Sequence, residues 1–305
     1  MASDDSPPSK KYDLIALGEA MLALAPPAGD TVRTCRTLHV DHAGAESNTC
    51  VGLARLGFRV AWVSRLGGDA AGDRILDALC REGVDTQWVA RDPRRPTGLI
   101  IKDGAAGVQY YRTGSAASVL GPETLHDVPV AHARAVLVSG VTALIGPEPH
   151  AAGLALLSTA RGFRIVDPNL RNGLWGSTRR AELVSAFVER CDILLGGVDE
   201  LAELVGAGTA EMIARRCRER GPREIVVRDA ESVCALTGDG EWIVVDIRRN
   251  SVVDPIGAGD AFNAGYIAVR LHGGSAADAI GAGVRCGAAV TASVSDTAGF
   301  PTRLK

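Results

Sequence analysis

The residues best suited to chemistry lie near the C-terminal end, where Gly257, Ala258 and Gly259 precede Asp260. Glycines let the backbone turn sharply, and the amides of a first helical turn can hold a developing phosphoryl charge. A carboxylate would repel a resting phosphate, so the chemistry left for Asp260 is to take a proton from an attacking hydroxyl. The turn therefore predicts a phosphotransferase site, although an aspartate that only caps the helix fits these residues equally well.

The composition limits the classes of function. The chain has 305 residues, 46% of them hydrophobic, which is enough for one large α/β domain or two smaller ones. A net charge of −3 argues against nucleic-acid binding, which calls for a basic surface. The seven scattered cysteines are typical of reduced thiols, and no apolar run is long enough to span a membrane. Residues 1–11 are polar and are expected to form a disordered tail, so we predict a cytoplasmic protein without a membrane partner.

Short apolar runs alternate with amphipathic segments along the chain. Strands are predicted at residues 14–17, 60–63, 99–101, 135–138, 163–166, 193–195, 225–227 and 242–245. Helices are predicted at residues 69–82, 151–160, 180–190 and 210–220, the first closing at Gly83. This alternation predicts an α/β fold with a mainly parallel sheet covered by helices on both faces.

Two regions break the alternation. Residues 22–42 and 96–112 carry extended and turn signals without a convincing helix. We expect them to pair as a small β-layer that closes over the C-terminal edge of the main sheet, where open α/β sheets bind ligands. Residues 12–305 are therefore predicted to form one domain with a discontinuous lid.

Several segments resemble the ribokinase-like (PfkB) carbohydrate kinases from about residue 14 to residue 301, in the order of that family. The C-terminal signature is Val253-Asp254-Pro255-Ile256-Gly257-Ala258-Gly259-Asp260-Ala261-Phe262. The N-terminal half matches through Ala43-Gly44-Ala45-Glu46-Ser47-Asn48-Thr49, Gly52-Leu53-Ala54-Arg55-Leu56-Gly57, Arg65-Leu66-Gly67-Gly68-Asp69 and Glu82-Gly83-Val84. By contrast, the sequence contains neither a P-loop motif nor a dinucleotide fingerprint.

The resemblance implies a three-layer α/β/α fold of about nine strands with a β-sheet lid, which often pairs subunits into a homodimer or higher homo-oligomer. It implies ATP as donor and Mg²⁺ as cofactor, and leaves open a monovalent cation such as K⁺ near Asp254. Asp260 would be the base and the turn formed by Gly257, Ala258 and Gly259 the anion hole. The ATP-binding residues would be Arg228, Ala230, Val233, Gly257, Gly259 and Cys286.

Three segments resemble one branch of the family, the 2-keto-3-deoxygluconate kinases: residues 110–118, residues 167–175, and Ser295-Asp296. A sugar acid carries a carboxylate, which Arg112 and Arg171 could grip by charge-assisted hydrogen bonds. The remaining substrate-binding residues would be Tyr110, which packs on the sugar, Asp296, which accepts from its hydroxyls, and Gly44 and Asn48.

Each assignment has a structural alternative. Arg112 could be a solvated strand arginine, Arg171 could pair with Asp167, Tyr110 could pack within the lid, and Asp296 could be a turn residue. The main hypothesis is an ATP-dependent kinase of 2-keto-3-deoxygluconate or a close sugar acid. A kinase of a neutral sugar such as fructose or ribose is the first alternative, and a non-catalytic sugar or nucleotide sensor is the second.

The sequence departs from the family at three places. Ile100 stands where these kinases often place a second substrate tyrosine. Only Glu200 remains of an Asn-x-x-Glu motif that organises metal and phosphate, so a metal role for Glu200 would be indirect, through water. Residues 228–233 lack both glycines of the usual nucleotide loop, and Val233 does not readily adopt a positive φ. We therefore expect this loop to have another shape.

Overall fold

The computed structural model describes residues 12–104, 107–170, 177–247, 256–291 and 295–303. Its centre is a sheet in which neighbouring strands pair in parallel from β5 to β11, whereas β12 and β13 are antiparallel. The predicted mainly parallel sheet is confirmed. Its order is β13 (Trp242–Asp246), β12 (Ser232–Leu236), β11 (Glu224–Arg228), β10 (Ile193–Gly197), β9 (Phe163–Asp167), β8 (Ala135–Ser139), β1 (Leu14–Leu17), β4 (Val60–Gly67) and β5 (Val89–Asp92).

Helices cover both faces of this sheet, because its central strands are apolar on both sides. Leu14 and Ala16 of β1 pack into one apolar cluster, and Ile15 and Leu17 pack into the other. The first cluster is closed by α1 (Ala45–Arg55), α2 (Ala70–Arg81), α8 (Ala258–Leu271) and α9 (Ala276–Val290). The second is closed by α3 (Gly140–Leu144), α4 (Pro147–Thr159), α5 (Ser177–Val188), α6 (Val198–Val205) and α7 (Ala210–Arg218). The three-layer α/β/α architecture is thus confirmed.

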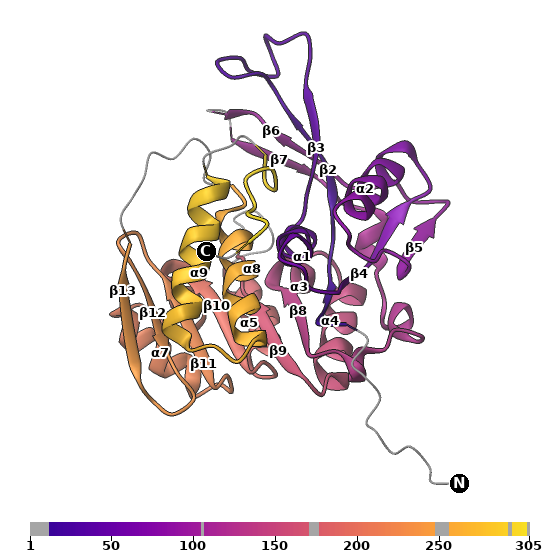
Figure 1. Cartoon of the computed structure of the whole chain (residues 1–305). Coiled ribbons are helices and arrows are strands. Elements are labelled where there is room, and N and C mark those ends of the chain that lie inside the picture. The colour runs from indigo at the N-terminus through magenta and orange to yellow at the C-terminus, as the bar shows by residue number, and fades with distance from the viewer. Residues whose placement is uncertain (1–11, 105–106, 171–176, 248–255, 292–294, 304–305) are drawn as a thin grey trace, which may run out of the picture.

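A second sheet projects from the first, at the top of Figure 1. Its order is β3 (His39–Ala43), β2 (Met21–Ala25), β6 (Leu99–Lys102) and β7 (Val108–Tyr111). The parallel pairing of β2 with β6 joins the two regions that the sequence sets apart. The predicted small second sheet is therefore present, and three short 3₁₀ helices follow it, at Ala116–Val119, Pro122–Leu125 and Val130–His132.

Local signals explain where several elements begin and end. Asp69 caps α2, since its Oδ1 accepts a hydrogen bond from the Gly72 amide (2.8 Å), and Gly83 follows the helix with φ of 80°. The helix predicted at residues 151–160 begins earlier, because Pro147 suits a first helical position. None of the described helices combines the length and the apolar character that crossing a membrane requires. The predicted tail, residues 1–11, lies outside the described residues.

Candidate active site

The N-terminus of α8 forms the floor of the site. Gly257 is its N-cap residue, with φ of 84°, a left-handed conformation that glycine adopts without strain. A Cβ at this position would lie 2.8 Å from the backbone oxygen of Asp296. Ala258, Gly259 and Asp260 form the first turn of the helix, whose amides have no intrahelical partner. The sequence therefore places a helix N-terminus, a structure that can hold an anion, at the predicted turn.

Helix α1 positions the carboxylate of Asp260, which is 8% exposed. Asn48 Nδ2 donates to Asp260 Oδ2 (2.8 Å), and Thr49 Oγ1 donates to the Asp260 backbone oxygen (3.3 Å). Asp260 occupies the third helical position, and Gly257 occupies the N-cap. The carboxylate lies buried at the floor of a pocket, where Asn48 orients it.

This pocket lies between the two sheets. Residues of the second sheet and the position after β7 line its roof: Met21, Ala43, Ile100, Lys102, Val108, Tyr110 and Arg112. Residues of the main layer line its floor and walls: Glu19, Gly44, Ala45, Asn48, Val141, Asn169, Ile256, Gly257, Asp260 and Asp296. Every predicted substrate-binding residue that the structure describes is in these two sets, whereas Arg171 lies outside the described residues.

Arg112 lies buried in the roof and is only 8% exposed, so it is not a solvated strand arginine. Its guanidinium carbon is 4.6 Å from the centre of the Tyr110 ring. Its Nη1 lies 3.3 Å from Glu19 Oε2, an ion-pair distance without hydrogen-bond alignment. Within the described part of the chain, Nε and Nη1 of Arg112 have no hydrogen-bond acceptor. Buried donors of this kind call for an acceptor from a ligand or water.

The carboxyl group of Glu19 is buried behind Arg112. Burial raises its pKa, and the charge of Arg112 and a hydrogen bond from Ser115 Oγ (3.0 Å) oppose that rise. Gly44 packs against the same residue, since a Cβ there would lie 2.4 Å from the Glu19 backbone oxygen. Gly44 is thus needed for close packing as well as for access to the pocket.

Asp296 is buried at the pocket wall, where Lys102 of β6 forms an ion pair with it. The neighbouring Ser295 donates to Asp41 Oδ2 (2.7 Å) in β3. Asp296 is therefore held by a charged partner and is more than a turn residue. The sequence reasoning missed Lys102, although its position two residues after Ile100 in a strand was a usable signal.

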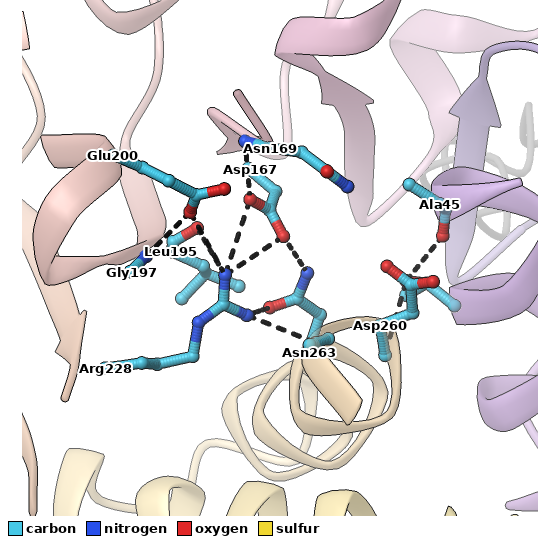
Figure 2. Close-up of polar contacts among 11 residues, drawn as sticks. Ala45, Asp167, Asn169, Leu195, Gly197, Glu200, Arg228, Asp260 and Asn263 are labelled. Atoms are coloured by element: carbon cyan, nitrogen blue, oxygen red, sulfur yellow. Dashed lines mark hydrogen bonds and ion pairs between the residues drawn. The ribbon is translucent and has the colours of Figure 1, made fainter. Parts of the chain in front are cut away.

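A second polar cluster lies beside the first turn of α8, at the ends of β9, β10 and β11 (Figure 2). Arg228 Nη1 donates to Asn263 Oδ1 (2.9 Å) and to the Gly259 backbone oxygen (3.2 Å). Its Nη2 lies 3.3 Å from Asp167 Oδ2, to which Asn263 Nδ2 also donates (2.6 Å). Burial lowers the pKa of Arg228, but the nearby carboxylates outweigh it and raise that pKa overall. Arg228 is thus held within the protein's own network.

The other residues predicted on the nucleotide side lie on β12, α6, α9 and the hairpin between β11 and β12. Glu200 Oε2 accepts from the Gly197 amide (2.8 Å) at the start of α6 and is 4.0 Å from Arg228. Ala230 lies exposed in a tight hairpin, closed by a hydrogen bond from the Asp229 amide to the Ser232 oxygen (2.9 Å). The altered shape expected of residues 228–233 is this hairpin.

Two predicted nucleotide-binding residues have buried side chains. Val233 of β12 pairs with Arg228 of β11, and its side chain packs into an apolar cluster. Cys286 is buried in α9, and burial raises the pKa of its thiol to about 11. Among the described residues, no three acidic, histidine or cysteine side chains are close enough to hold a metal ion together.

The arrangement suits transfer of a charged group to a hydroxyl. A helix N-terminus can stabilise developing negative charge, and the buried carboxylate beside it can accept a proton. The pocket above them presents cations on the side of the second sheet and carboxylates from Glu19, Asp260 and Asp296, which suits a polar acceptor with several hydroxyls.

Known proteins resemble this chain in sequence and in fold. A model of the pfkB family of carbohydrate kinases matches residues 11–303. The chain is 33% identical over 308 residues to 2-dehydro-3-deoxygluconokinase of Bacillus subtilis (strain 168), an alignment that covers 97% of this chain and 94% of that protein. A crystal structure of a PfkB protein from Polaromonas sp. JS666 is 32% identical, with a TM-score of 0.82 over 91% of this chain and 95% of that one. Fructokinase with bound ATP from Xylella fastidiosa shares the fold at 21% identity, with a TM-score of 0.83 over 95% of each chain.

Proposed function

The chain belongs to the pfkB family and is a carbohydrate kinase, and we propose that its acceptor is a sugar acid. The proposed reaction transfers the γ-phosphoryl group of ATP to the primary hydroxyl of 2-keto-3-deoxygluconate (2-dehydro-3-deoxygluconate) or a close 2-keto-3-deoxy sugar acid. Relatives named for this activity and the bound ATP of the Xylella fastidiosa fructokinase support the two substrates.

One observation carries the proposal. Arg112 and Asp260 line the same pocket, and two donor atoms of the buried guanidinium have no acceptor within the described residues. A sugar acid has a carboxylate at one end of its six-carbon chain and a primary hydroxyl at the other. The carboxylate would bind Arg112 by charge-assisted hydrogen bonds, and the hydroxyl would reach Asp260.

Each group of the site then has a defined task. Asp260 takes the proton as the hydroxyl oxygen bonds to the γ-phosphorus and the bond to the bridging oxygen of ADP breaks. The amides of Ala258, Gly259 and Asp260 stabilise the charge on the transferring group. Magnesium bound with ATP would offset the charge of the phosphates, and Glu200 is the side chain proposed to reach it through water.

The direct test is a panel of sugar acids and neutral sugars, assayed by ADP release with the phosphorylated product identified by mass spectrometry. We expect kcat/KM to be highest for a 2-keto-3-deoxy sugar acid. Higher turnover of fructose or ribose than of every sugar acid would instead make the protein a neutral-sugar kinase. Sugar binding in calorimetry without ATP turnover at any Mg²⁺ concentration would make it a sensor.

A further inference from the structure

The second sheet places a lysine over the acceptor pocket. Ile100 and Lys102 are two residues apart in β6, so their side chains lie on the same face of the strand, and both line the pocket. Tyr110 pairs with Ile100 across β6 and β7, which aligns the same face of both strands. Ile100 thus offers the pocket no hydroxyl group, whereas Lys102, two residues farther along the same strand, offers it an ammonium group.

The ammonium group of Lys102 is enclosed. Its side chain is 12% exposed, and it pairs with Asp296, whose side chain is 3% exposed. This ion pair connects the second sheet to the segment that packs against Gly257. A Cβ at Gly257 would lie only 2.8 Å from the Asp296 backbone oxygen. Lys102 therefore contacts the wall of the pocket immediately beside the anion-binding helix end.

Among the described residues, carboxylates outnumber cations in the lining of the pocket. Among the described residues that line it, three carry carboxylates (Glu19, Asp260 and Asp296) and two carry cations (Lys102 and Arg112). Arg112 is already opposed by Glu19, so an entering carboxylate meets a pocket without surplus positive charge. Without Lys102, Asp296 would add an uncompensated negative charge that repels an anionic acceptor much more than a neutral one.

We propose that Lys102 is a specificity-determining residue of the acceptor site, which neutralises Asp296 and thereby admits the carboxylate of a sugar acid. This inference rests on the proposed function. It differs from a purely mechanical role, in which Lys102 would only hold the second sheet against the main layer. A mechanical role affects all acceptors equally, whereas the electrostatic role depends on the charge of the acceptor.

The experiment compares the acid with its carboxamide, which keeps every hydroxyl and removes the charge. We would measure KM for 2-keto-3-deoxygluconate and the inhibition constant of its amide in the wild type, Lys102→Met and Lys102→Arg. Because Lys102→Met leaves the charge of Asp296 uncompensated beside an anionic acceptor, KM for the acid should rise about 10- to 100-fold. We expect the inhibition constant of the amide to change by less than about threefold, and Lys102→Arg to restore KM for the acid.

Arg74→Met is the matched control, because Arg74 Nη2 also ties the second sheet to the main layer, through the Val40 backbone oxygen (2.9 Å), but lies outside the pocket. It should change neither constant. If Lys102→Met shifts the constants for acid and amide by equal factors, or shifts neither, the role assigned to Lys102 is wrong while the proposed function stands. A wild type that prefers neutral sugars would overturn both.

Discussion

Two arginines near the candidate site differ in what surrounds them: Arg112 is buried in the roof of the pocket, and Arg228 is partly buried beside the first turn of α8. Arg112 has two donor atoms without acceptors among the described residues and lines the pocket with Asp260. Arg228 donates to Asn263 and to Gly259 and pairs with Asp167, so the protein itself occupies its donors. A buried arginine with open donors is available to a ligand, whereas one with occupied donors holds the structure. This contrast underlies our proposal that the Arg112 side binds the acceptor and that the Arg228 cluster supports the fold.

The largest effect should come from Asp260→Asn. Asparagine keeps an oxygen for the hydrogen bond from Asn48 but cannot accept the proton, so kcat should fall by about 10²–10⁴ with the fold intact. Asp278→Asn is the control, because Asp278 holds the equivalent third position of α9. Steady-state kinetics and circular dichroism measure both, and an Asp260→Asn enzyme with wild-type kcat would exclude Asp260 as the base.

Arg228→Met should affect stability more than acceptor binding. It leaves Asp167 buried without its cation, and the free energy of unfolding should fall by about 3–5 kcal/mol in urea titrations. Arg215→Met is the control, since it breaks an exposed pair with Glu211 and should cost less than about 1 kcal/mol. Unchanged stability combined with a much higher KM for ATP would show that Arg228 is a nucleotide ligand and not a support.

Gly257→Ala tests whether the helix end depends on glycine. A side chain at positive φ costs about 1–3 kcal/mol, and the added Cβ would also press on Asp296. Gly273→Ala is matched, because Gly273 has φ of 79° but nothing lies within 4 Å of its added Cβ. Thermal unfolding should show a loss for both, and only Gly257→Ala should also lower kcat. Equal effects on both measurements would mean that the contact with Asp296 is irrelevant.

Arg112→Gln should have the smallest effect of the four, and it should be selective. The loss of one charge-assisted contact predicts a rise of about 10- to 100-fold in KM for a sugar acid, with little change in kcat. The inhibition constant of the corresponding carboxamide should change much less. An equal rise for acid and amide would mean that Arg112 shapes the pocket without recognising charge, which would remove the contrast with Arg228.

Local sequence patterns were enough to predict several strands, the ends of α2 and the turn before Asp260. Continuous apolar runs such as residues 14–17 indicated strands buried on both faces, and Asp69 and Gly83 marked the ends of α2 because capping is a local property. The glycines before Asp260 indicated the sharp turn and the start of α8 for the same reason, whereas anion binding there stays a prediction. These features need no knowledge of distant contacts.

The sequence did not predict side-chain contacts between residues that are far apart along the chain. The role of Lys102 depends on which face of β6 meets the pocket and on Asp296, which is 194 residues away. The open donors of Arg112 and the occupied donors of Arg228 differ only through partners from other elements. Residues 232–236 were missed as a strand because that segment was compared with a nucleotide loop, whereas pairing with β11 and β13 makes it β12.

The orientation of the acceptor in the pocket decides whether Arg112 and Asp260 have the roles proposed for them. A crystal structure of the Asp260→Asn protein with 2-keto-3-deoxygluconate and a non-hydrolysable ATP analogue measures that orientation directly. We predict that the sugar carboxylate will accept hydrogen bonds from Arg112, with the primary hydroxyl beside residue 260 and the γ-phosphate at the N-terminus of α8. A carboxylate bound away from Arg112, or a primary hydroxyl turned away from residue 260, would contradict the account.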